Sequence, residues 1–249
     1  MSENINILGY NVSSKSIESI VSEALTGSKL SIVNTINPHS YVEAKKDKIF
    51  RTALKRSDVI IPDGSGIVLA AKKLHGVNLR KVAGADLFFE TMTSLNSKSG
   101  KVFFLGSTDE VLEKIKNRAA IEFPNVAVEV LSPPYKPEFS DEDKQSFIDS
   151  INRSSSDVIF VGLTAPKQEK LIYDISAKIQ GQMVSGIGAV FDFYAGSVNR
   201  PKQIWLDMHL EWFVRLLGEP KRLWKRTFVS APIFLFDLYR AKLMGKNNA

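Results

Sequence analysis

Short apolar runs alternate with amphipathic segments along most of this chain, and this alternation restricts its fold more than any other feature. The runs have the length and the β-branched or aromatic content of strands, and the segments between them space their apolar residues as helices do. Strand–helix–strand order predicts a parallel sheet with right-handed crossovers. The six predicted strands lie within residues 30–37, 58–66, 101–108, 126–135, 157–170 and 182–196.

The segments between these strands predict the helices that flank the sheet. One long helix is expected over residues 38–57, another from Asp86 to about Gly100, and a third that is capped by Asp109. We therefore expect an α/β fold that is Rossmann-like, with a mostly parallel sheet of about six strands flanked by helices. Residues 1–199 would form this domain, and residues 200–249 a C-terminal helical appendage.

The predicted appendage carries the whole net charge of the chain. Residues 200–249 contain ten Lys or Arg against four Asp or Glu, so residues 1–199 are neutral within a chain of net charge +6. All three tryptophans, Trp205, Trp212 and Trp224, lie among these basic residues. A neutral body with a basic, aromatic and amphipathic end is typical of a domain that binds an anionic surface, either a membrane or a nucleic acid.

Several classes of protein are disfavoured by composition. The chain has no cysteine, and its three histidines, His39, His75 and His209, are far apart, so neither a disulfide framework nor a His-rich metal cluster is expected. The N-terminus does not have the pattern of a signal peptide, and no apolar run reaches the roughly 18 residues of a spanning helix. We expect a cytoplasmic protein that lies on a membrane without crossing it.

Polar residues and glycines gather where the predicted strands end. Ligands of open α/β sheets bind at these carboxyl ends, and glycines there let backbone amides approach a phosphate. A nucleotide or sugar-nucleotide site is one interpretation, and turns that merely connect strands to helices are the other. Gly106, Gly162 and Gly188 are the glycines predicted to contact the ligand. No G-x-G-x-x-G follows the first strand and no P-loop is present, which disfavours a nicotinamide dehydrogenase and an ATPase.

Asp63 is the carboxylate that stands out. It follows an apolar run and precedes Gly64, Ser65 and Gly66, which places it at the end of the second predicted strand. A general base needs a fixed carboxylate within reach of the hydroxyl that it deprotonates. The alternative is that Asp63 caps the next helix, and position alone does not decide between the two.

Six motifs in a fixed order resemble one known family. They are NTINPHSYVEA, IIPDGSGIVLAAKKLHG, VAGADLF, VGLTAPKQEK, GIGAVFDFYAG and EWFVRLLGEPKR. From about Ile32 to Arg226 the chain resembles the WecG/TagA/CpsF family of bacterial glycosyltransferases. The resemblance implies an inverting transfer of a hexose, N-acetylmannosamine or its uronic acid, from a UDP-sugar to a sugar linked to undecaprenyl pyrophosphate. It implies no cofactor and no metal. The only D-x-D pattern, Asp141-Glu142-Asp143, reads as a helix start.

The resemblance also implies roles for single residues. Asp63 would be the general base, Thr35 and Asn37 would line the pocket beside the donor sugar, and Gln168 would hydrogen-bond to the phosphate or the sugar of the donor. Asp192 would accept a hydrogen bond from ribose or uracil.

Further implied contacts involve the nucleotide base and the phosphates. Tyr135 would contact the base. Where the family usually has an arginine this chain has Lys81, so either Lys81 acts as a point charge or Arg80 substitutes for the missing guanidinium. In the appendage, Arg215, Arg222 and Arg226 are candidates for binding the lipid-linked pyrophosphate at the inner face of the plasma membrane.

Other functions remain as alternatives. A nucleic-acid-binding module would use the basic tail, but the neutral body offers no basic groove, so no nucleic-acid partner is expected. A non-catalytic sugar-nucleotide-binding protein, a glucosyltransferase-type member with a different donor, and a nicotinamide or flavin enzyme on a similar sheet stay open. The sequence does not decide between a monomer and a homo-oligomer.

Overall fold

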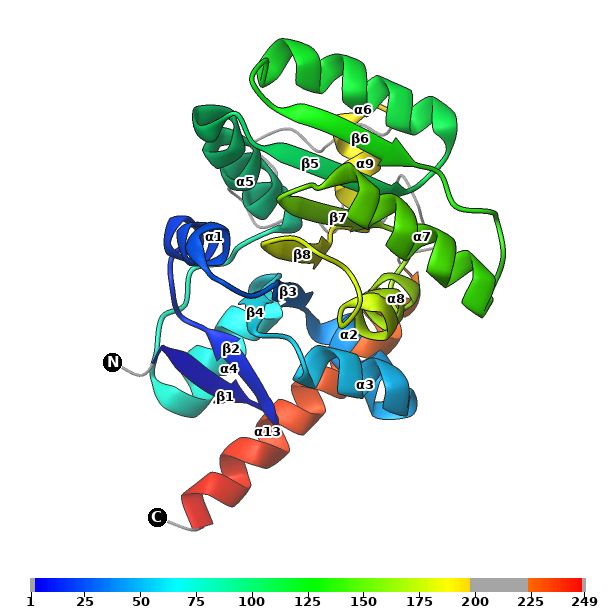
Figure 1. The fold of residues 1–249 in the computed structure, drawn as a ribbon. Helices are drawn as coiled ribbons and strands as arrows, with labels where there is room; N and C mark the ends of the chain where they lie inside the picture. Colours follow the sequence, from blue (N-terminus) through cyan, green and yellow to red (C-terminus); the bar gives the residue numbers. More distant parts are fainter. Residues whose placement is uncertain (1–2, 198–223, 248–249) are drawn as a thin grey trace.

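The structure, a computed structural model, describes residues 3–197 and 224–247. Its centre is a six-stranded sheet in the order β4-β3-β8-β7-β5-β6 (Figure 1), in which every neighbouring pair is parallel. The α/β fold predicted from the sequence is thus confirmed. The strands are β3 (Ser31–Ile36), β4 (Val59–Pro62), β5 (Lys101–Gly106), β6 (Ala127–Leu131), β7 (Val158–Gly162) and β8 (Met183–Gly186).

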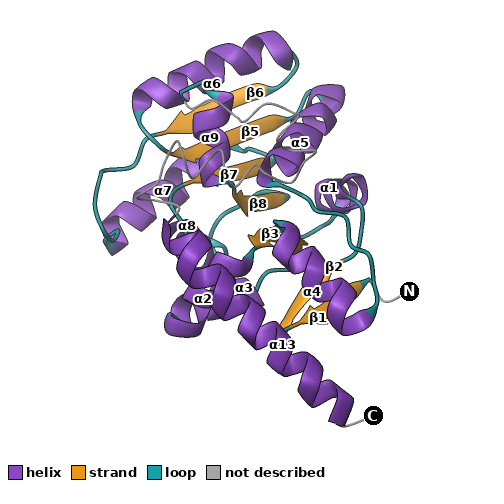
Figure 2. Ribbon diagram, turned by 180° about the vertical axis from the view of Figure 1, so that it is seen from behind, coloured by secondary structure: helices purple, strands orange, loops and turns teal. Residues whose placement is uncertain are grey.

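Helices cover both faces of this sheet (Figure 2). One face packs on α1 (Ile17–Thr26), α5 (Gly84–Lys98), α6 (Asp109–Glu122) and α9 (Gly188–Tyr194). The other face packs on α7 (Asp141–Ser154) and α8 (Lys167–Ile175). The sequence explains this arrangement, because all five residues of β7 are buried, and a parallel strand covered on both faces reads as one continuous apolar run.

A separate group of elements surrounds the β4 edge of the sheet. It contains α2 (Pro38–Lys46), α3 (Lys48–Lys55) and α4 (Ser65–His75), together with an antiparallel hairpin of β1 (Asn4–Ile7) and β2 (Tyr10–Ser13). The hairpin was not predicted from the sequence. Its two turn residues, Leu8 and Gly9, both have positive φ, and leucine is an unusual residue for such a turn.

Several helix boundaries differ from the prediction. The helix α5 begins at Gly84 rather than Asp86, and α9 occupies residues predicted as the exit loop of the sixth strand. Two further differences have a clear local cause. The long helix expected over residues 38–57 is two helices, because Asp47 has an extended backbone and its side chain accepts a hydrogen bond from the Phe50 amide of α3. The cap of α6 is Thr108, whose hydroxyl accepts from the Val111 amide, and Asp109 is the first residue of the helix. In both places a short polar side chain competes with the helical backbone for hydrogen bonds.

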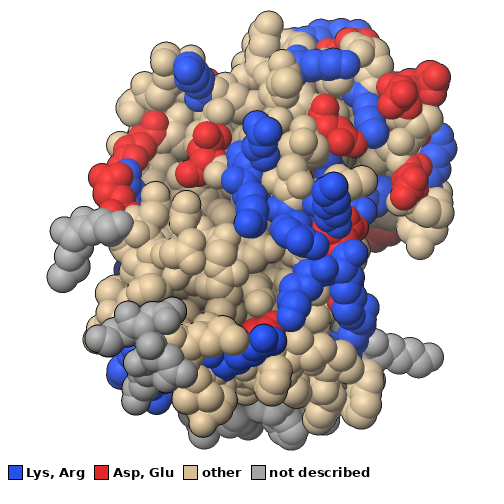
Figure 3. All heavy atoms as spheres, turned by 90° about the horizontal axis from the view of Figure 1, so that it is seen from below, with Lys and Arg blue, Asp and Glu red and all other residues tan. Residues whose placement is uncertain are grey.

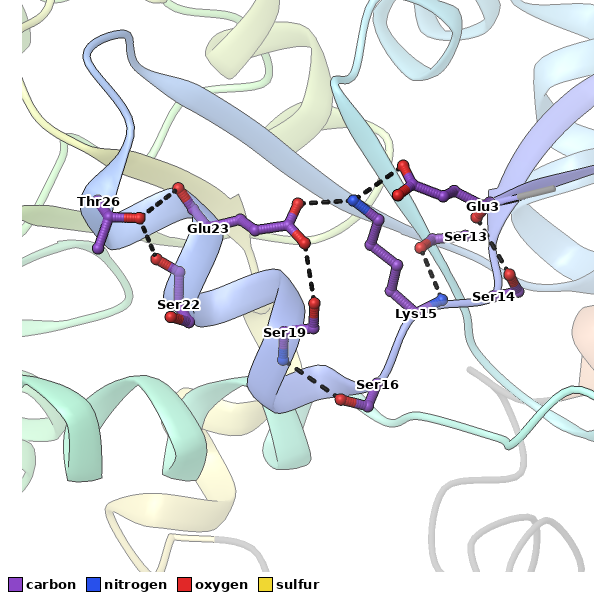
Figure 4. A network of polar contacts seen from close by, with 9 residues as sticks. All are labelled: Glu3, Ser13, Ser14, Lys15, Ser16, Ser19, Ser22, Glu23 and Thr26. Atoms are coloured by element: carbon purple, nitrogen blue, oxygen red, sulfur yellow. Dashed lines mark hydrogen bonds and ion pairs between the residues drawn. The ribbon is translucent and has the colours of Figure 1, made fainter. Parts of the chain in front are cut away.

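A polar network ties the hairpin to α1 (Figure 4). The Lys15 ammonium lies 3.0 Å from Glu3 and 2.6 Å from Glu23, and the Ser16 hydroxyl caps α1 by accepting from the Ser19 amide. The two carboxylates are more than half exposed, so the cap contributes more to stability than the ion pairs do.

The described end of the chain, residues 224–247, is called the C-terminal segment below. It consists of the π-helical turn η1 (Lys225–Ser230) and α13 (Ala231–Asn247), and it lies against α2 and α4 in both ribbon views (Figures 1 and 2). Phe234 and Leu238 are buried in the same apolar cluster as residues of α2, α4 and the hairpin. The predicted division at residues 199 and 200 lies outside the described residues and stays a prediction.

Polar contacts also fasten the C-terminal segment to α2. Asp237 accepts from the Tyr41 hydroxyl at 3.0 Å and pairs with the Lys45 ammonium at 2.6 Å. Lys225 pairs with Glu43 at 3.2 Å. Through the buried Phe234 and these pairs, the segment is part of the folded body rather than an independent module.

Candidate active site

Asp63 lies directly after β4, at the edge of the sheet where all six strands end. Its amide donates to the Ile36 carbonyl at 2.9 Å, which ties it to the end of β3. Its carboxylate oxygen Oδ2 accepts from Asn37 Nδ2 at 3.1 Å. The helix that follows is capped by Gly64 without any side-chain bond, so Asp63 does not serve as its cap.

The orientation of Asn37 is fixed by a second set of bonds. Its Oδ1 accepts from the amides of His39 and Ser40, at 3.0 and 2.9 Å, and so caps α2. Because the amide oxygen faces the helix, the NH₂ group must face Asp63. Thr35 lies two residues earlier on β3, in register with Ile61 of β4. The structure thus brings together the three residues predicted to be catalytic.

The two cations predicted beside the phosphate lie in the loop that precedes α5. The Val82 amide donates to the Pro62 carbonyl at 3.1 Å, so the neighbouring Lys81 lies close to the end of β4. Arg80 is exposed, and its charge acts on Glu18. Hydrogen bonds from the Glu18 backbone and from Ser16 lower the pKa of Glu18, and Arg80 adds to that effect. Proximity to β4 favours Lys81 for the predicted contact.

Gln168 belongs to α8, yet its side chain reaches the turn between β8 and α9. Its Oε1 accepts from the Gly188 amide at 3.0 Å, and its Nε2 donates to Glu169 Oε1 at 2.9 Å. A Cβ on Gly186 would lie 2.8 Å from this amide, so a larger residue there would displace the Gln168 side chain. Gln168 is buried, and its predicted contact with the donor stays a prediction.

The remaining predicted glycines have a structural explanation of their own. Gly106 and Gly162 are partners in the register of β5 and β7, and a Cβ on Gly106 would overlap the Gly162 backbone. A Cβ on Gly162 would overlap the ring of Phe191, and one on Gly188 would overlap the Leu163 carbonyl. Tight protein packing is sufficient to require glycine at these positions, and contact with a phosphate stays a prediction.

The two residues predicted to bind uridine lie away from Asp63. Asp192 is on α9, which follows β8 at the centre of the sheet. Tyr135 is fully exposed, in the loop after β6. Since β4 and β6 are the opposite edges of the sheet, about 24 Å separates them at the usual strand spacing. A ligand that touches both Asp63 and Tyr135 would have to lie extended along the carboxyl edge.

The predicted arginines of the appendage are described only in part. Arg215 and Arg222 lie outside the described residues. Arg226 belongs to η1, and its charge acts on the half-buried His39 of α2 and on the buried Glu169 of α8. Arg226 therefore lies where η1 contacts α2, near enough to α8 for its charge to act on Glu169, and a contact with the lipid-linked pyrophosphate stays a prediction.

His39 and Glu169 were not predicted as site residues from the sequence, although they lie inside the motifs NTINPHSYVEA and VGLTAPKQEK. His39 Nδ1 lies 2.8 Å from the Ser230 hydroxyl of η1. Burial, with a further contribution from the charge of Arg226, lowers the pKa of His39 to about 4. Burial also raises the pKa of Glu169. Their positions next to Asn37 and Gln168 are the signal that could have identified them.

We expect the contact between the C-terminal segment and α2 to weaken as pH falls from about 6.5 to 4. A released His39 would titrate near its ordinary value of 6.5, whereas the contacting imidazole titrates near 4. Between these values the released state binds more protons, so acid favours release. Above about 6.5 both states are neutral, and no dependence is expected. Hydrogen exchange of residues 225–240 between pH 4.5 and 7.5 measures the effect.

His39→Gln is the control for this pH dependence. Glutamine still reaches a hydroxyl but does not titrate, so the difference between the two proteins isolates the imidazole from carboxylates that titrate in the same range. Identical pH dependence of exchange in both proteins would contradict the assignment.

Metal ligands do not gather in the described part of the chain. Among residues 3–197 and 224–247, no three His, Asp or Glu side chains lie together in a way that could hold an ion. The Asp141-Glu142-Asp143 pattern forms the first turn of α7, where Asp143 accepts from the Ser140 amide and pairs with Lys136.

Comparison with known proteins gives a consistent result. The family model described as "Glycosyl transferase WecG/TagA/CpsF family" matches residues 5–248. A relative from Bacillus subtilis (strain 168) is 30% identical over 209 residues, which cover 84% of this chain and 79% of the relative. A relative from Bacillus spizizenii is 31% identical, over 85% of this chain and 79% of the relative.

A third relative, from Staphylococcus aureus (strain MW2), is 26% identical over 84% of this chain and 79% of its own length. All three relatives are named N-acetylglucosaminyldiphosphoundecaprenol N-acetyl-beta-D-mannosaminyltransferase. The family match covers nearly every described element, including the edge that holds Asp63, Asn37 and Thr35. This chain belongs to the WecG/TagA/CpsF family of glycosyltransferases.

Proposed function

We propose that this glycosyltransferase moves N-acetylmannosamine, or its uronic acid, from a UDP-sugar to a sugar linked to undecaprenyl pyrophosphate. The transfer inverts the anomeric centre and needs no divalent metal. The names of the relatives support the acceptor and the transferred sugar. The observation that carries the proposal is the hydrogen bond from Asn37 to Asp63, because it presents an oriented carboxylate at the ligand-binding edge of the sheet.

Asp63 acts as the general base of this reaction. Its carboxylate takes the proton of the acceptor hydroxyl while the hydroxyl oxygen bonds to C1 of the donor sugar. The bond between C1 and the diphosphate oxygen breaks, and the departing UDP keeps the electron pair. Attack from the face opposite UDP inverts C1. Asn37 holds the carboxylate in place, and Thr35 lies beside the same reaction centre.

The donor lies extended along the carboxyl edge of the sheet. Its sugar is near β3 and β4, its diphosphate is near Lys81 and the Gln168 side chain, and its uridine lies toward Asp192 and Tyr135. Fixed dipoles and a cation stabilise the charge that grows on the leaving diphosphate. Lys81, as a compact ammonium, supplies charge without the bidentate geometry of arginine.

The C-terminal segment places this site at the membrane. No helix in the described residues has the length and apolarity needed to span a bilayer. On α13 the residues Phe236, Tyr239 and Leu243 are exposed, on the side opposite the buried Phe234 and Leu238. Viewed from below, from the side of α13 and the hairpin, the molecule shows a band of Lys and Arg beside a wide uncharged area (Figure 3).

Cations beside an exposed apolar face suit the interface of an anionic bilayer, where the lipid-linked acceptor resides. The enzyme would then be peripheral at the inner face of the plasma membrane. Arg226, with Arg215 and Arg222, would approach the pyrophosphate of the acceptor there.

A UDP-release assay tests the proposed function. Purified protein is mixed with an N-acetylglucosaminyl-pyrophosphoryl-undecaprenyl acceptor in vesicles, and with UDP-N-acetylmannosamine, its uronic acid or UDP-glucose. We expect acceptor-dependent UDP release with one of the two mannosamine donors, unchanged by EDTA. Release from UDP-glucose alone would overturn the donor assignment, loss with EDTA would overturn metal independence, and no release from any donor would overturn the transfer.

A further inference from the structure

Glu169 is a buried carboxylate that the proposed reaction does not use. It lies in the first turn of α8 and is only 4% exposed. Its Oε1 accepts from Gln168 Nε2 at 2.9 Å, and its Oε2 has no hydrogen-bond partner among the described residues. A charged group is costly to bury with so few partners, so a glutamate in this place calls for a reason.

The bond to Gln168 suggests that reason. Gln168 uses its oxygen on the Gly188 amide at 3.0 Å and its nitrogen on Glu169. The Gly188 amide and Glu169 therefore hold the Gln168 amide from both ends, because its oxygen accepts from Gly188 while its NH₂ group donates to Glu169. The links Glu169–Gln168–Gly188 connect α8 to the turn after β8, at the centre of the carboxyl edge.

Burial favours the neutral form of Glu169. Burial raises the pKa of Glu169, while the Gln168 bond, its own backbone amide and the charge of Arg226 act in the opposite direction. The neighbouring helices present charges that are already paired with other residues of α8: Asp47 with Lys170, and Lys144 with Asp174. A neutral acid next to Gln168 does not repel a bound diphosphate, whereas a negatively charged carboxylate would.

We propose that Glu169 is a positioning residue that acts through Gln168 on the binding of the donor's diphosphate. It holds the Gln168 amide, and through it the turn at Gly188, in the arrangement that receives the nucleotide. This inference rests on the proposed function, because it takes UDP to be the leaving group. It adds Glu169 to the residues that determine donor affinity.

The test is the binding of UDP, measured by titration calorimetry with the full-length protein. Glu169→Gln keeps the shape, the oxygen that accepts from Gln168 and the neutrality of the acid, so we expect UDP affinity within about twofold of the original. Glu169→Ala removes the acceptor, and we expect affinity to fall about tenfold, the size of one net hydrogen bond. In turnover with the lipid acceptor, the KM for the donor should rise in the alanine variant with kcat nearly unchanged.

Controls separate this effect from unfolding. Glu110→Ala, on the exposed surface of α6, should bind UDP as the original does. If Glu169→Ala does not fold, Glu169→Asp serves instead, because its carboxyl is one methylene too short to reach Gln168 and should weaken binding similarly.

The outcomes distinguish the two proposals. If the original protein does not bind UDP, the proposed function fails and this inference fails with it. If the original binds UDP and the alanine or aspartate variant binds equally well, only this inference fails. A glutamine variant as weak as the alanine variant would show that the negative charge is needed, and would overturn positioning by the neutral acid.

Discussion

Replacing Asp63 by asparagine is expected to lower kcat by about a thousandfold while UDP affinity stays within a few-fold. General-base catalysis is typically worth between about a hundredfold and ten-thousandfold, and asparagine cannot take a proton. The substitution keeps the size of the side chain and an oxygen that can accept from Asn37 Nδ2, so the local geometry should survive. Steady-state UDP release with the lipid acceptor measures kcat, and calorimetry measures UDP affinity.

Asp58→Asn is a matched control for this substitution. Asp58 directly precedes β4, at the amino-terminal end of the strand that Asp63 follows, and its Oδ2 accepts from the Ile32 amide of β3 at 2.8 Å. Asparagine retains an acceptor for that bond, so the control should keep its activity. Asp63→Asn with nearly full kcat would show that Asp63 is not the base, and the proposed chemistry would then need a different residue.

Exchanging Phe236, Tyr239 and Leu243 for serine is expected to weaken binding to anionic vesicles by about a hundredfold. These side chains are between 46% and 66% exposed on α13, and inserting each into the interface contributes about 1 kcal/mol. Flotation with vesicles that contain anionic lipid measures the loss. Turnover should fall for the undecaprenyl acceptor but not for a short-chain, water-soluble analogue, because the reaction centre is untouched.

Ile121 on α6 offers the matched control, since it is 82% exposed but far from the C-terminal segment. Its exchange for serine should leave vesicle binding unchanged. Substitution is a sharper experiment than deletion from about residue 200, because deletion would also remove Phe234 and Leu238 from the core. If the triple variant floats with vesicles as well as the original protein, α13 is not the docking surface.

The candidate reaction centre could be predicted from the sequence because its signal is local. Asn37 directly follows β3 and Asp63 directly follows β4, and the carboxyl ends of parallel strands lie at the same edge of a sheet. The bond between the two residues needed the structure, since it depends on β3 and β4 being neighbours and on α2 fixing the Asn37 oxygen.

The helix boundaries that were predicted wrongly also depend on nearby residues, but there several polar side chains compete to cap the same helix. Thr108 and Asp109 are both good caps, and only the backbone conformation shows that Thr108 is the one used. Asp47 interrupts a helical pattern because its side chain satisfies the first turn of α3 better than a continued helix would.

The sequence by itself determined that this chain forms a parallel α/β sheet with a polar carboxyl edge, because buried strands and amphipathic helices carry their periodicity in the order of residues. Only the tertiary structure decided the order of the strands, which sets Asp63 and Tyr135 at opposite edges and brings Gln168 to Gly188. It alone showed that Phe234 of α13 completes a core with α2 and α4. Such contacts join residues far apart in the chain, and they are selected by the joint burial of several surfaces rather than by any local pattern.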